Sequence, residues 1–133
     1  MTVPQVSQAK ASSPGARAGF WVVAVLGVVL SAIAWTWYGL AFFEAQTEQG
    51  KALSAGTTMA GTGELMGGAP VALAHVGGLI TLLILGWKGY RARGIVLAFV
   101  VVLVCSAIGI GVAQVLWEGQ LFQLGIDNDT YVP

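Results

Sequence analysis

Three long apolar stretches, separated by polar or glycine-rich segments, dominate this sequence. They cover residues 19–43, 70–87 and 95–117, and none of them contains Asp, Glu, Lys or Arg. A helix needs about 20 apolar residues to cross the hydrocarbon core of a bilayer. The pattern therefore predicts an all-α integral membrane protein with three transmembrane helices over these ranges.

Four less apolar segments flank or connect the predicted spans. Residues 1–18 form a polar tail with little apolar surface. In the long loop 44–69, the first ten residues suit a short surface helix and the glycine-rich remainder is predicted to be irregular. Residues 88–94 form a tight basic turn, which makes the second and third spans antiparallel neighbours, and residues 118–133 form an acidic tail.

The second predicted span is the shortest of the three. Pro70 suits the first turn of a helix, where its missing N–H is not needed. About 18 residues from Pro70 to Trp87 is short for a span. The residues just before Pro70 are therefore candidates for the membrane-embedded helix as well.

The charged residues divide the predicted helix ends into two sets. Five of the six basic residues flank the start of the first span and the turn 88–94. All six acidic residues, and the remaining basic residue Lys51, lie in the loop 44–69 or the C-terminal tail. Basic residues collect on the cytoplasmic side of membrane proteins. The predicted topology therefore places the N-terminus and the turn 88–94 in the cytoplasm, and the loop 44–69 and the C-terminus outside.

The composition limits the classes of function. With 56% hydrophobic and 9% charged residues, the chain is far from a soluble domain, in which about 25% of residues are charged. The basic residues are split between short segments and form no continuous surface for nucleic acid. The bias toward Ala, Gly and Val suggests a GC-rich bacterial genome, and hence a multi-pass protein of the bacterial inner (plasma) membrane.

His75 is the one histidine of the chain and lies inside a predicted span, where it is the side chain that titrates closest to neutral pH. Three roles compete: a haem or metal ligand, a proton or quinone contact, and a neutral imidazole hydrogen-bonded between helices. The first role lacks partners, because the chain has no second His. We favour the third, with Gln114, predicted at a similar depth, as the polar partner. Cys105 is interpreted as a small packing residue.

Small residues mark the predicted helix contacts, because close packing drives helix association in lipid. The third span carries them on opposite faces, one with Gly109 and one with Gly111, which indicates neighbours on both sides. The alternative is that the stripes only reflect the 19 glycines of the chain. The predicted packing residues are Gly27, Ser31, Gly77, Gly78, Gly109 and Gly111.

No motif for phosphate binding, nucleophilic catalysis or metal chelation occurs, and the sequence does not predict an enzyme or a cofactor bound by this chain alone. A structural lipid or a nearby quinone are the ligands considered. The predicted partners are lipid and other membrane subunits, with no nucleic acid.

The general plan combines a GC-rich composition, few spans, a polar N-terminal tail and an acidic outer tail. In this it resembles the small accessory membrane subunits of actinobacterial respiratory assemblies, such as the supercomplex of menaquinol–cytochrome c oxidoreductase with cytochrome c oxidase. The resemblance implies a non-catalytic subunit for assembly, bridging or lipid shielding in respiratory electron transfer, beside subunits that hold the haems and copper. It transfers no site residue. The alternative is a small homo-oligomeric transporter or channel subunit, with His75 and Gln114 lining a pore.

Overall fold

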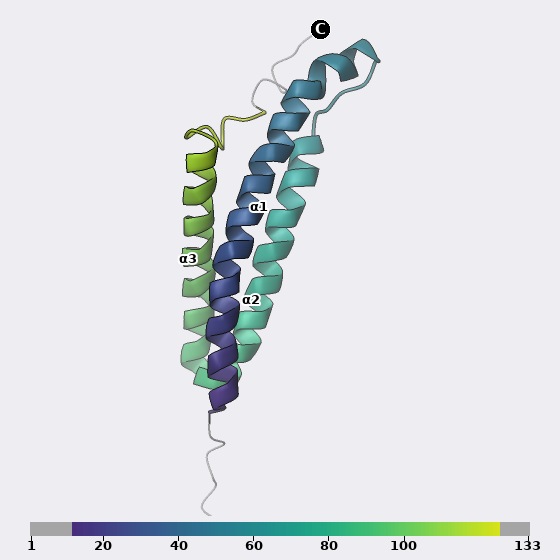
Figure 1. Ribbon diagram of the computed structural model, residues 1–133. Coiled ribbons are helices and arrows are strands. Elements are labelled where there is room, and N and C mark those ends of the chain that lie inside the picture. The colour runs from purple at the N-terminus through teal and green to yellow at the C-terminus, as the bar shows by residue number, and fades with distance from the viewer. Residues whose placement is uncertain (1–11, 126–133) are drawn as a thin grey trace, which may run out of the picture.

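The computed structural model describes residues 12–125 and shows an up–down–up bundle of three long helices (Figure 1). The helices are α1 (Pro14–Ser54), α2 (Ala69–Tyr90) and α3 (Ala92–Leu116), and a short π-helix, η1 (Glu64–Gly68), directly precedes α2. Residues 12–125 contain no strand. The all-α prediction is confirmed. The predicted tails lie partly outside this range, at residues 1–11 and 126–133.

Each of the three helices is long and apolar enough to cross a membrane. Their most apolar 18-residue windows have mean hydropathies of 2.2 for α1, 2.0 for η1 with α2, and 3.0 for α3. Only 6% to 22% of the residues in each window are buried inside the bundle, so most of each apolar segment is exposed. The predicted multi-pass membrane protein with three spans is confirmed.

The start of α1 lies earlier than the predicted boundary at residue 19. Ser13 caps the helix, because its hydroxyl accepts a hydrogen bond from the Ala16 N–H, and Pro14 occupies the first turn. Arg17 is then helical, and its Nε donates to the carbonyl of Gly89 at 2.9 Å. These contacts hold the start of α1 against the end of α2.

The end of α1 lies well past the predicted boundary at residue 43. The helix has 41 residues, or about 60 Å at 1.5 Å per residue, about twice the thickness of a hydrocarbon core. The expected surface helix is thus the continuation of the first span. The loop that follows folds back on it, since Gln49 accepts a hydrogen bond from the Met59 N–H at 2.7 Å and donates to the Thr58 hydroxyl.

The second membrane helix also begins earlier than predicted, because η1 adds to it. Glu64–Tyr90 forms one apolar helical segment of 27 residues, with Pro70 near the start of its α-helical part. Gly67 of η1 packs on α1, where a Cβ added at Gly67 would lie 3.2 Å from the Tyr38 carbonyl oxygen. The last part of the segment predicted to be irregular is therefore helical and packs on α1.

Only Arg91 separates α2 from α3, with a φ of 60°. Figure 1 shows the two helices running antiparallel, with their connection at the same end of the bundle as the start of α1. The best-packed core lies toward this end, where Phe20, Leu82 and Ala98 are at most 3% exposed.

Candidate functional site

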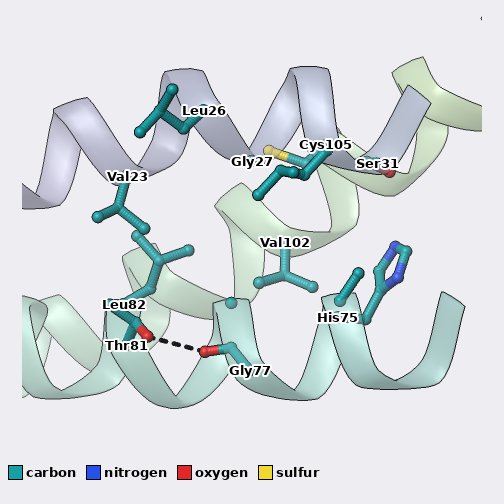
Figure 2. A pocket seen from close by; sticks show the side chains of 13 residues that line it. Val23, Leu26, Gly27, Ser31, His75, Gly77, Thr81, Leu82, Val102 and Cys105 are labelled. Atoms are coloured by element: carbon teal, nitrogen blue, oxygen red, sulfur yellow. Dashed lines mark hydrogen bonds between the residues drawn. The ribbon is translucent and has the colours of Figure 1, made fainter. Parts of the chain in front are cut away.

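A cavity of about 330 Å³ lies between the middle portions of α1 and α2 (Figure 2). These two helices supply most of its lining, and Val102 and Cys105 of α3 complete it. The lining is mainly apolar. Its polar side chains are Ser31, His75, Thr81 and Cys105.

Gly77 and Gly78 line this cavity. A Cβ added to either residue would meet no atom within 4 Å. The prediction that these glycines bring α2 against another helix is therefore not met within residues 12–125. A glycine always leaves the volume of a side chain free. Whether a neighbouring helix fills that volume depends on the contacts that hold the two helices together at their ends.

The imidazole of His75 rises from α2 into the space toward α1, as Figure 2 shows. Its Nδ1 lies 2.7 Å from the carbonyl oxygen of Val71, one turn earlier on the same helix. Its Nε2 is buried and has no hydrogen-bond partner. The Trp35 ring packs edge-on against the imidazole, with ring centroids 6.1 Å apart.

The predicted hydrogen bond between His75 and Gln114 does not form. The His75 Nδ1 is bonded to the Val71 carbonyl, and the His75 Nε2 has no hydrogen-bond partner. The side-chain oxygen of Gln114 instead accepts a hydrogen bond from the Leu121 N–H at 3.3 Å, where the chain turns back after α3. Gln114 thus helps to hold the segment that follows α3, and the pairing was a wrong prediction.

A difference in depth explains this correction. Gly67 packs against the Tyr38 backbone, and Trp117 lies against Gly39, one residue further along α1, so these two contacts are nearly level. His75 is eight residues, or about 12 Å, beyond Gly67 on its helix. Gln114 is three residues, or about 5 Å, from Trp117. His75 is therefore the deeper residue by more than one helical turn.

Ser31 is the second polar residue with an unsatisfied atom. It is 4% exposed, and its Oγ and the His75 Nε2 are the buried side-chain oxygen and nitrogen atoms without a partner among residues 12–125. The other two polar groups are satisfied. Thr81 donates to the Gly77 carbonyl at 2.9 Å, and the Cys105 thiol contacts the Ala24 carbonyl at 3.5 Å.

The two small-residue faces of α3 have different environments. Gly109 packs directly on α1, where an added Cβ would lie 2.8 Å from the Ser31 carbonyl carbon. Cys105 lies on the same buried face, with its Sγ 3.4 Å from a Cβ added at Gly27. Ala107 and Gly111, on the opposite face, are exposed, and a Cβ at Gly111 would meet no atom within 4 Å.

Two close glycine contacts were missed from the sequence. Gly86 and Gly94 meet backbone to backbone, so that a Cβ added at Gly86 would lie 3.0 Å from the Gly94 carbonyl carbon. Gly39 accommodates the Trp117 indole, whose Nε1 donates to the Thr36 carbonyl at 3.4 Å. The first contact had a signal, because Gly86 and Gly94 are each four residues from Tyr90, which lies within the predicted turn 88–94.

Residues 12–125 contain no group of three or more His, Cys, Asp or Glu side chains placed to hold a metal ion. Comparison of the chain with models of known protein families, with characterised proteins and with solved structures finds no match.

Proposed function

We propose that this chain is a non-catalytic accessory subunit of a larger membrane complex in a bacterial plasma membrane. The observation that carries the proposal is the outward face of α3, where Ala107 and Gly111 are exposed four residues apart. The opposite face of the same helix is already occupied by α1 through Gly109. The subunit would contribute assembly, bridging between partners, or shielding of a partner from lipid.

The physical basis is the way helices associate in lipid. Apolar side chains gain little by leaving lipid for another helix, so association depends on close approach of backbones at small residues. Around Gly111 the larger side chains Val104, Ile108 and Val115 are 50%, 43% and 80% exposed. They lie beside the small residues on the same exposed surface, which a helix of another subunit would cover.

The general plan of the sequence supports a respiratory electron-transfer complex as the parent assembly. In that setting the partner subunits would hold the redox groups. We further propose that the end of the bundle with Arg17, Lys88 and Arg91 is cytoplasmic, following the distribution of basic residues. Two matched variants at exposed positions test this orientation: an impermeant thiol reagent should label Ala55→Cys and not Ala92→Cys in intact cells, and the reverse result contradicts it.

A pore lined by His75 and Gln114 is less well supported by the geometry. His75 faces a cavity formed by its own chain, and Gln114 is engaged by the Leu121 backbone at a different depth. A pore would need both side chains on one shared surface.

Co-purification tests the accessory role. A tagged wild-type chain extracted in mild detergent should retain other membrane subunits in fixed ratio. Gly111→Leu should reduce this retention at least about tenfold, because one bulky side chain separates the helices along the seam. Val96→Leu, on the same face near the opposite end of α3, is the matched control and should retain the partners.

A second variant separates loss of partners from loss of folding. Gly109→Leu should lower the amount of folded subunit itself, since its side chain would collide with the Ser31 backbone. Recovery of the wild-type chain solely as a homo-oligomer would overturn the accessory role and favour the pore. Retention of partners by Gly111→Leu at the wild-type level would remove the contact on which the proposal rests.

A further inference from the structure

We propose that the cavity beside His75 binds a membrane-soluble molecule with an apolar body and a polar head that carries a hydroxyl group. The hydroxyl would donate a hydrogen bond to His75 Nε2. This inference does not depend on the accessory role, because the cavity is formed within a single chain.

The hydrogen bond that His75 already makes determines which kind of group it can accept. A carbonyl oxygen only accepts, so the 2.7 Å contact with the Val71 carbonyl places the proton on Nδ1. In the neutral imidazole that suits an apolar span, Nε2 then carries a lone pair. A ligand must therefore donate to it, which favours an alcohol or a phenol over a ketone, an ether or an ester.

The two buried polar side chains without a hydrogen-bond partner, His75 and Ser31, lie toward one end of the cavity. Figure 2 shows His75 and Ser31 toward one end, with Val23 and Leu82 toward the other. Ser31 and Val23 are eight residues apart on α1, or about 12 Å. The Ser31 hydroxyl is also buried without a partner, and its oxygen lies against Gly109 of α3, so His75 Nε2 is the polar atom on which the proposal rests. The cavity thus matches a molecule with a polar head and an apolar body of roughly this length.

The cavity has a size and an access route that suit a lipid-soluble ligand. Its volume of about 330 Å³ lies at the lower end of the usual range for small-molecule pockets. Leu26 and Leu30 on its α1 side are 55% and 58% exposed, so the cavity adjoins the surface that faces the bilayer. A single water, with a share of about 30 Å³, would leave most of this apolar space unfilled.

The single histidine of the chain provides a direct readout. The full chain, purified without a polyhistidine tag and labelled with ¹⁵N-histidine, would be placed in phosphatidylcholine nanodiscs. The probes are farnesol and its methyl ether, and a prenylated hydroquinone kept reduced with its dimethyl ether. A hydroxyl probe should shift the Nε2 resonance and bind about tenfold more tightly than its ether.

The two pairs of probes distinguish the source of the hydroxyl. Tighter binding of farnesol indicates a membrane alcohol, and tighter binding of the hydroquinone indicates a phenol. Equal binding of each hydroxyl probe and its ether would overturn the proposal. An Nε2 resonance that none of the probes moves would overturn it as well, and would leave water as the partner of His75.

Variants of the lining locate the bound probe. Gly78→Leu fills the cavity without meeting another atom at its Cβ and should abolish binding of tritiated farnesol. His75→Phe should remove the preference for farnesol over its ether. Gly50→Leu is the matched control, because it adds the same side chain at a glycine outside the cavity whose Cβ would also meet no atom within 4 Å, and it should bind as wild type. Wild-type binding by Gly78→Leu would place the probe elsewhere and contradict the assignment.

Discussion

Two pairs of glycines on α2 show how differently the same residue can act within one helix. Gly86 and Gly89, near the turn, are buried against Gly94 and Arg17. Gly77 and Gly78, about two to three turns earlier on the helix, face a cavity, and a Cβ added to either would meet no atom within 4 Å. A small residue permits a close contact, and the position of the neighbouring helix decides whether the contact is made.

The ends of α2 account for this difference. At one end, the one-residue turn at Arg91 forces Gly86 against Gly94, and Gly89 packs on Arg17. At the other end, Gly67 of η1 packs on the Tyr38 backbone. The space between α1 and α2 opens between these two contacts. The cavity is therefore a consequence of where the helices are held together.

The largest effect is expected for Gly86→Leu. Its side chain would have to enter the Gly94 backbone, which has no flexible atoms that could move aside. We expect a loss of about 2–3 kcal/mol of stability, in line with overpacked cores. Unfolding of the purified protein by increasing SDS in mixed micelles measures it. A loss below about 0.5 kcal/mol would show that the backbone contact at the turn is not important for packing.

A much smaller effect is expected for Gly77→Leu, which is the same substitution in the open part of the helix. No atom opposes the new side chain, and glycine is a poor helix former, so the change in stability should stay within about 1 kcal/mol and can be favourable. The same SDS titration measures it. A loss as large as that of Gly86→Leu would mean that α1 and α2 close over the cavity in the membrane, and the contrast between the two pairs would disappear.

The spans could be predicted because each one is an uninterrupted apolar run, and no tertiary information is needed to read it. The contacts inside the bundle could not be read in the same way. The predicted pairing of His75 with Gln114 assumes that the two side chains lie at a similar depth in their spans. The π-helix at Glu64–Gly68 lengthens the second span and places His75 deeper. The small-residue pattern predicts Gly109 as a packing residue without naming its neighbour, and the structure packs it on Ser31 of α1, whereas the same pattern at Gly77 lines a cavity.

The two faces of α3 show the same contrast between a glycine that contacts another helix and a glycine that does not. Gly109 packs against α1, whereas no atom lies within 4 Å of a Cβ added at Gly111, although both glycines belong to regular stripes of small residues. The central claim is that another protein fills the open stripe in the native membrane. The neighbours of the open stripe on α3 can be identified in intact cells, without extracting the protein into detergent. A photoreactive phenylalanine analogue would be placed at Val115, which is 80% exposed and one turn from Gly111.

Irradiation of intact cells that carry the analogue at position 115 should give an adduct with one different membrane protein. The analogue at Ile84, 52% exposed on α2, is the control for random collisions and should not give that adduct. An adduct of position 115 with a second copy of this chain, or with lipid alone, would contradict the proposal that this chain is a subunit of a larger complex.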